Sequence, residues 1–142
     1  MEIRKCRRED VTSVYQLISE LKNTQFNFDD FQKVYYTKLS DIKNYYAVAV
    51  KENNIIGFVS LVIDYQLHHV DKVGTIEELI VDSKSRSQGV GKMLLNHAVC
   101  YAREKKCDVV ELTSGFSREN AHRFYEKNGF HKGSFKFKIT LK

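Results

Sequence analysis

The segment from Thr75 to Leu95 most constrains the fold, because its sequence character changes twice along its length. Its first part, Thr75 to Val81, is rich in β-branched residues and predicts a strand, whereas apolar side chains recur at helical spacing from Gly89 onward. The charged, glycine-bearing turn between them therefore connects a strand to a helix start. Backbone N–H groups at such a helix start can converge on an anion. The segment predicts an α/β fold with an anion-binding turn.

Hydrophobic periodicity predicts the remaining elements of this α/β fold. We expect a central, largely antiparallel mixed sheet of about six to seven strands, flanked by about four helices. Asp29 or Asp30 is expected to cap the second helix, and Ser117 the fourth. Proline is absent and no linker is evident, so residues 1–142 are expected to form a single domain. The expected strands are 2–6, 45–51, 55–65, 73–81, 108–113 and 135–142, and the expected helices are 8–22, 29–40, 89–105 and 118–127.

Composition narrows the class of protein. The net charge of +5 allows nucleic acid or a phosphorylated small molecule as a partner, but no Lys/Arg run with interleaved aromatic residues favours nucleic acid. The three cysteines have neither CxxC nor CxxH spacing, which predicts neither a disulfide framework nor a metal site. The N-terminal segment lacks a signal-peptide pattern and no apolar stretch is long enough to cross a membrane. We therefore expect a cytoplasmic protein without a metal or a membrane partner.

Two motifs carry a resemblance to a known family. Residues 86–91 read RSQGVG and are similar to the Arg/Gln-x-x-Gly-x-Gly/Ala signature of the GNAT acetyltransferase superfamily. Residues 120–130 read NAHRFYEKNGF and resemble the Asn-x-x-Ala-x-x-Phe-Tyr-x-x-x-Gly-Phe motif of that family, with a shorter spacing between Asn120 and Ala121. The expected order of helices and strands also fits the GNAT fold from end to end. Two motifs in the right order are far more specific than two glycines alone.

This resemblance implies that the chain binds acetyl-CoA. Backbone N–H groups from Gln88 to Lys92 would hold the pyrophosphate at the helix N-terminus. The backbone of Leu79 to Val81 would pair with the pantetheine arm, and Asn120 would contact the pantetheine or a nearby water. The residues expected at the cofactor are Leu79, Ile80, Val81, Arg86, Ser87, Gln88, Gly89, Val90, Gly91, Lys92 and Asn120.

The chemistry of amine acetylation needs a base, because an alkylamine with a pKa of about 10 is almost fully protonated at neutral pH. A carboxylate within reach can accept that proton. Glu77 lies nine residues before Arg86, the base position in family members that resemble polyamine acetyltransferases, and Glu78 is the second candidate. Strand alternation places the two on opposite faces unless a bulge intervenes. Tyr125 matches the family's general acid; the alternatives are solvated carboxylates and a tyrosine that only packs in the core.

The resemblance implies an N-acetyltransferase that moves acetyl from acetyl-CoA to a primary amine by direct transfer in a ternary complex. The acceptor stays open among polyamines, amino sugars, aminoglycosides, amino acids and protein N-termini. Two other interpretations are a non-catalytic acyl-CoA-binding module and a basic nucleic-acid-binding protein. His68 and His69 are expected in a hairpin loop, with no assigned role. An exposed edge or the apolar face of residues 135–142 would allow a homodimer.

Overall fold

The structure is a computed structural model that describes residues 1–115 and 118–142. The chain divides into two units, Met1–Glu111 and Leu112–Lys142. The sheet contains five strands in the order β1-β2-β3-β4-β5. The helices and strands up to the end of the sheet are, in chain order, β1 (Glu2–Lys5), α1 (Val11–Lys22), α2 (Phe28–Leu39), β2 (Asn44–Lys51), β3 (Asn54–Gln66), β4 (Asp71–Val81), α3 (Val90–Glu104) and β5 (Val109–Leu112). Short 3-10 turns lie at Arg8–Asp10 and Ser83–Ser85.

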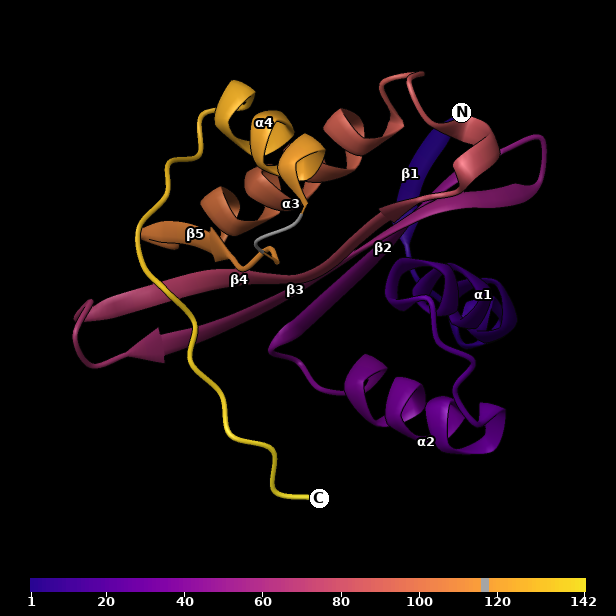
Figure 1. Ribbon diagram of the computed structural model, residues 1–142, viewed down its shortest axis with the longest axis horizontal. Coiled ribbons are helices and arrows are strands. Elements are labelled where there is room, and N and C mark those ends of the chain that lie inside the picture. The colour runs from indigo at the N-terminus through magenta and orange to yellow at the C-terminus, as the bar shows by residue number, and fades with distance from the viewer. Residues whose placement is uncertain (116–117) are drawn as a thin grey trace. The chain divides into compact units, whose positions relative to one another are not determined.

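The first four strands pair antiparallel with their neighbours in the sheet. Helices α1 and α2 lie on one face and α3 lies on the other (Figure 1). The face under α1 and α2 carries a core in which Val14 and Tyr35 pack with Tyr46, Phe58 and Ile80 of the strands. The predicted α/β class and the antiparallel meander are confirmed.

The start of α2 differs from the prediction in its capping residue. The side chain of Asn27 accepts a hydrogen bond from the N–H of Asp30 at 3.0 Å, so Asn27 is the N-cap. Asp29 and Asp30 instead occupy the first turn, where carboxylates interact favourably with the helix dipole. Asn and Asp can both cap a helix, and the closeness of the three residues in sequence explains the error.

A β-bulge interrupts the pairing of β3 with β4 at Glu77. Ser60 is opposite Glu78, whereas the next residue, Leu61, is opposite Ile76, so Glu77 is the additional residue on β4. The bulge changes the alternation of side chains along β4 at this point. It allows Glu77 and Glu78 to face the same side of the sheet, which simple alternation would forbid.

Two strand glycines let α3 lie close to the sheet. A Cβ atom on Gly57 of β3 would lie 2.7 Å from Leu94 Cδ1 and 3.3 Å from the carbonyl oxygen of Ile80. A Cβ atom on Gly74 of β4 would lie 3.3 Å from the Cβ of Ala102. Glycine within a strand often marks such a close approach. Here the two glycines let α3, the helix that begins at the glycine-bearing turn, pack directly against the sheet.

Gly57→Ala is expected to lower the free energy of unfolding by about 1–3 kcal/mol, because the added methyl group must displace the fully buried Leu94. Gly57→Val should cost more, since its branches also approach Val90 at the start of α3. Urea unfolding measures both. Gly133→Ala is the control, because no atom lies within 4 Å of the Cβ that it would add. Equal stability of Gly57→Val and the parent chain would contradict this packing.

The second unit contains α4 (Glu119–Lys127) and the C-terminal segment. The helix ends at Lys127 with Asn128 as its C-cap residue, and Gly129 follows with a φ of 94°, the left-handed conformation expected after a helix. The expected cap Ser117 lies outside the described residues. Residues 131–142 form neither helix nor strand, so the predicted strand over 135–142 is wrong and the sheet has five strands. Alternation specifies the two faces of a strand but not the neighbour with which it pairs.

Candidate active site

The N-terminus of α3 is built to receive an anion. Gly89 is the N-cap residue and adopts a φ of 78°, which favours glycine, and no side chain caps the helix. The first N–H groups of a helix have no acceptor within the helix, so those following Gly89 are available to a ligand. The first turn of α3 contains no acidic residue and includes Lys92. A cation at a helix N-terminus interacts unfavourably with the helix dipole, and a bound anion would offset that effect. The free N–H groups and Lys92 therefore make this helix start suitable for a phosphate group.

Arg86 lies in the turn, and its side chain has hydrogen-bond partners on α1 and at the end of β4. Its guanidinium donates to Glu20 Oε1 on α1 at 3.3 Å, and its Nε donates to the carbonyl oxygen of Val81 at 3.3 Å. Glu20 Oε1 also accepts a hydrogen bond from the backbone N–H of Ser83 at 3.2 Å. These bonds attach the turn to α1. Arg86 therefore fixes the turn before α3 against α1 and β4, and Glu20 is a partner that the sequence motifs did not indicate.

Glu20→Ala is expected to raise the dissociation constant of a ligand held by this turn by a factor of about 1.4 to 5, because an exposed ion pair contributes about 0.2–1 kcal/mol. The catalytic rate at saturation should change little, since Glu20 acts only through Arg86 and Ser83. Calorimetric titration with the ligand and a KM-against-kcat comparison measure the two quantities. Glu9→Ala, at an exposed site before α1, is the control. An unchanged dissociation constant in Glu20→Ala would contradict a positioning role.

The end of β4 extends past its neighbour β5. The N–H of Asp108 donates to the carbonyl oxygen of Lys72 at 2.8 Å, which places the start of β5 beside the start of β4. Strand β5 spans four residues, whereas β4 continues to Val81. With a rise of about 3.3 Å per residue, β5 cannot cover Leu79–Val81. Those residues therefore present backbone groups with which an extended ligand can pair.

Two carboxylates face the α1/α2 side of β4. Glu77 Oε1 lies 4.0 Å from Nζ of Lys38 on α2. Glu78 is half-buried, and its carboxylate accepts a hydrogen bond from the Ser60 hydroxyl, while the Ser60 oxygen accepts the Glu78 N–H at 2.9 Å. Tyr46, Ser60 and Glu78 are opposite one another across β2, β3 and β4. The bulge thus brings both candidate bases to one face, with Glu77 the more accessible and Glu78 fixed by Ser60.

Burial raises the pKa of Glu78, and the nearby charge of Glu77 adds to this rise. The Ser60 hydrogen bond and the charges of Lys22 and Lys38 act in the opposite direction but are outweighed. Burial also raises the pKa of Tyr46, as do the charges of Glu78 and Glu77. The charges of Glu77 and Glu78 therefore disfavour ionisation of the Tyr46 phenol.

Glu78→Gln is expected to increase the free energy of unfolding at about pH 8, by on the order of 1 kcal/mol, and to leave it nearly unchanged at about pH 4. Below the ordinary glutamate pKa the carboxyl is protonated in both the folded and the unfolded chain. Above its raised pKa, the folded chain carries a half-buried carboxylate, a cost that glutamine avoids. Urea unfolding at both pH values measures the difference, with exposed Glu52→Gln as the control. A stability change independent of pH would contradict it.

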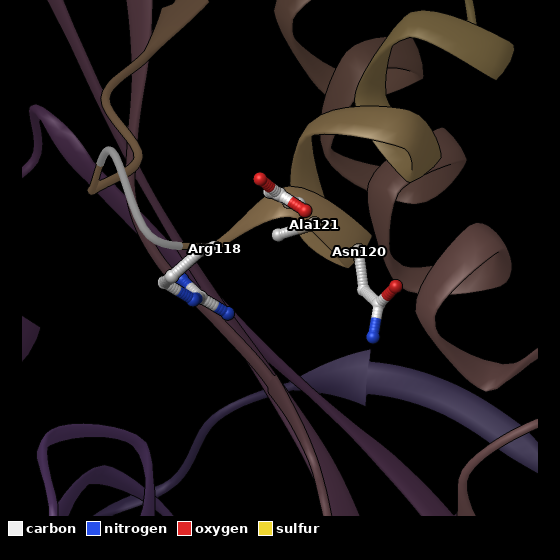
Figure 2. Close-up of a pocket in the computed structure, with 4 residues that line it drawn as sticks. Arg118, Asn120 and Ala121 are labelled. Carbon is white, nitrogen blue, oxygen red and sulfur yellow. The ribbon is translucent and has the colours of Figure 1, made fainter.

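The second unit presents Tyr125 and the start of α4. Burial raises the pKa of the Tyr125 phenol, and Arg118 opposes that rise. Figure 2 shows Arg118 and Asn120 projecting from the N-terminal end of α4, where both line a pocket. The amide oxygen of Asn120 accepts a hydrogen bond from Arg123 one turn later. In the family motif the asparagine lies three residues before the alanine. Counted back from Ala121, that position is occupied by Arg118 in this chain, so the motif spacing is the sequence feature that indicates Arg118.

The loop histidines have neighbours within the first unit. Nε2 of His69 lies 3.4 Å from Glu111 Oε1 on β5, and the His68 and His69 rings are 4.5 Å apart. Among the described residues, no group of three or more His, Cys, Asp or Glu side chains is arranged to hold a metal ion. No helix in the described ranges has the length and apolar character needed to span a bilayer.

Comparison with known proteins decides the family. A sequence model described as the Acetyltransferase (GNAT) family matches residues 11–130. The chain belongs to the GNAT acetyltransferase family. The aminoalkylphosphonate N-acetyltransferase of Salmonella typhimurium is 34% identical to this GNAT protein over 140 residues, covering 99% of this chain and 91% of that one.

Further relatives agree with this assignment. The glucosamine 6-phosphate N-acetyltransferase of Trypanosoma brucei brucei is 26% identical, covering 99% of this chain and 96% of that one. A crystal structure of a Trypanosoma brucei acetyltransferase superposes with a TM-score of 0.83 at 26% identity and covers 99% of both chains. The GNAT protein is therefore an N-acetyltransferase, and acetyl-CoA is the donor used by its family. The predicted family and enzyme class are confirmed.

Proposed function

We propose that this GNAT protein acetylates the primary amine of a small acceptor by direct transfer from acetyl-CoA within a ternary complex. One observation carries the proposal: β4 bears two carboxylates on one face and leads, through the turn fixed by Glu20, into the uncapped N-terminus of α3. A candidate base and an anion site thus follow each other along one strand–turn–helix segment. The family match to residues 11–130 covers residues of both units and supports a single GNAT domain over residues 1–142.

The donor-binding residues fit a pyrophosphate. The first N–H groups of α3 and the Lys92 ammonium supply donors and positive charge, and the first turn has no acidic side chain to oppose an anion. Leu79–Val81 supply strand backbone beyond the end of β5 for the pantetheine arm. When bound, acetyl-CoA supplies the acetyl group as an activated thioester. Ser87 and Gln88 would complete the turn around the pyrophosphate. The resemblance of residues 120–130 to the family motif supports a donor-binding role for Asn120.

Glu77 is the proposed base. It lies nine residues before Arg86, the base position in family members that resemble polyamine acetyltransferases. The bulge places its exposed carboxylate on the α1/α2 side of β4. There the carboxylate would take a proton from the acceptor ammonium, directly or through a water, to give the nucleophilic amine. Glu78, fixed by Ser60, would keep a second negative charge nearby and favour the ammonium form during binding.

Tyr125 is the proposed acid. A phenol whose pKa is raised by burial stays protonated at neutral pH and can donate its proton to the departing sulfur. The family motif around Tyr125 supports this role, and the hydrogen bond from Phe130 N–H to the Tyr125 carbonyl oxygen, at 3.0 Å, helps to fix the end of α4.

The acceptor is proposed to be a small amine that also carries an anionic group. The relative that is 34% identical over almost the whole chain is named for aminoalkylphosphonates, and the trypanosomal relative for glucosamine 6-phosphate. Both names describe an amine that carries a phosphorus-centred anion. The net charge of +5 is compatible with such acceptors.

Initial-rate measurements test the proposal. CoA release is followed with acetyl-CoA and a panel that contains 2-aminoethylphosphonate, glucosamine 6-phosphate, spermidine, an aminoglycoside and a peptide with a free N-terminus. We expect the phosphorus-containing amines to give the highest kcat/KM and intersecting double-reciprocal lines, as direct transfer requires. Parallel lines and an acetylated enzyme would contradict direct transfer, and a preference for spermidine would contradict the acceptor class.

A further inference from the structure

Two lysines converge on the carboxylates of β4. Lys38 lies in the last turn of α2, and its Nζ is 4.0 Å from Glu77 Oε1. Lys22 is the last residue of α1, and its charge acts on Glu78 together with that of Lys38. The two helices come from different parts of the chain but cover the same face of the sheet. Two positive and two negative side chains therefore lie around one surface of the first unit.

This charge cluster contributes little to folding. The side chains of Lys38 and Glu77 are 41% and 40% exposed, and ion pairs this exposed contribute little to stability. A lysine in the last turn of a helix also interacts favourably with the helix dipole, but that effect does not require it to face a carboxylate. At 4.0 Å the pair is also longer than a charge-assisted hydrogen bond of about 2.7–2.9 Å. The Lys38 ammonium and the Glu77 carboxylate are thus free to bind a ligand.

The signs of the charges select between acceptors. An ammonium group is attracted to Glu77 and Glu78, whereas a second cationic group on the same molecule meets Lys38 and Lys22. A polyamine is therefore disfavoured. A molecule with an ammonium group at one end and an anion at the other matches both sets of charges.

We propose that Lys38 binds the anionic group of a zwitterionic acceptor whose amine lies at Glu77. This inference rests on the proposed function and adds to it the residues that select the acceptor. The ligand and the protein pair would form an alternating set of four charges, in which each ammonium group contacts an anion.

The distance between the two side chains favours a short acceptor. Because Lys38 Nζ and Glu77 Oε1 are 4.0 Å apart, an ammonium and an anion separated by a similar distance can contact both side by side, in the most compact arrangement of the four charges. A spacer of one or two carbons, with bonds of about 1.5 Å each, provides that separation. A longer flexible spacer must fold back and loses conformational entropy on binding. The structure therefore favours amines with one or two carbons between the nitrogen and the anionic group.

The test compares amines of matched length with and without an anionic group. Wild type and Lys38→Gln are assayed with 2-aminoethylphosphonate, O-phosphoethanolamine and β-alanine, and with n-propylamine, which carries no anionic group. We expect Lys38→Gln to lower the ratio of kcat/KM for 2-aminoethylphosphonate to that for n-propylamine at least about tenfold, since one charge-assisted contact is lost. The phosphonate, phosphate ester and carboxylate distinguish which anion is preferred. Aminomethylphosphonate and 4-aminobutylphosphonate test the spacer, and the longer compound should be the poorer acceptor.

Lys33→Gln is the matched control, because Lys33 is an exposed lysine on α2 one and a half turns before Lys38. It should leave the ratio unchanged. Lys38→Glu should lower the ratio further than Lys38→Gln does, since it replaces attraction by repulsion. An equal ratio in wild type, Lys38→Gln and Lys38→Glu would overturn the inference.

A binding measurement separates this inference from the proposed function. Calorimetric titration with 2-aminoethylphosphonate, in the presence of CoA, reports acceptor affinity without turnover. Weaker binding in Lys38→Gln but not in Lys33→Gln supports the anion site even if no amine is acetylated. Conversely, turnover of 2-aminoethylphosphonate with equal binding by wild type and Lys38→Gln would retain the proposed function and overturn the role of Lys38.

Discussion

Glu77→Gln is expected to lower kcat/KM for a primary amine by about 10²–10⁴-fold, because glutamine cannot accept the proton of the acceptor ammonium. The loss should be largest at low pH, where the free amine is scarcest, and smaller near the pKa of the amine, about 10. The affinity for acetyl-CoA should be retained, since Glu77 lies on β4 and not in the turn before α3. Initial rates of CoA release across the pH range, with calorimetric titration of acetyl-CoA, measure both effects.

Glu78→Gln is the matched comparison for Glu77→Gln. Glu78 is adjacent, acidic and on the same face, but its carboxylate is held by Ser60 and its pKa is raised by burial. We expect the substitution to lower activity by less than Glu77→Gln, because it removes a neighbouring charge and leaves the base in place. If Glu78→Gln instead causes the larger loss, and removes the low-pH limb of the profile, Glu78 is the base. If neither substitution affects the rate, base catalysis by β4 is contradicted.

Tyr125→Phe is expected to lower kcat by about 10²-fold or more, because phenylalanine cannot donate a proton to the departing sulfur. Burial raises the pKa of Tyr125, so the phenol stays protonated through neutral pH, and loss of its proton should lower the wild-type rate only at alkaline pH. The substitution removes one oxygen atom and keeps the ring that packs with Phe124 and Phe130, at centroid distances of 5.4 and 6.0 Å. Folding and acetyl-CoA affinity should therefore change little.

The control for this substitution is Tyr65→Phe, at a tyrosine that is 72% exposed near the end of β3. It should leave kcat unchanged. Stopped-flow measurement of CoA release in a single turnover reports the chemical step for both variants. A Tyr125→Phe enzyme that releases CoA as fast as wild type would remove the acid role and leave Tyr125 as a packing residue.

Local sequence patterns predicted the elements around the site because each is specified by its own residues. The period of the apolar side chains placed α3 within a residue of its observed ends, Val90 and Glu104. The turn before it was predicted from Gly89, which does adopt a left-handed conformation. The hairpin of β2 and β3 followed from β-branched runs and a polar turn.

Features that depend on pairing between distant residues were not predictable in this way. The bulge at Glu77 is defined by the partners of Ser60 and Leu61 on β3, so it is absent from the sequence of β4 alone. The attachment of Arg86 to Glu20 joins residues 66 positions apart. The strand predicted over 135–142 failed for the same reason, because alternation without a specified neighbour does not determine pairing. Gly57 carried a usable signal, a glycine within a strand pattern, that indicates close helix approach.

The most direct measurement of the central claim is the identity of the product formed from acetyl-CoA and 2-aminoethylphosphonate. Mass spectrometry and CoA quantification are performed on the same reaction. The account predicts N-acetylated 2-aminoethylphosphonate and one CoA for each molecule formed, with much less product from n-propylamine at the same concentration. Acetyl-CoA binding without any acetylated amine, or equal acetylation of the phosphonate and n-propylamine, would contradict it.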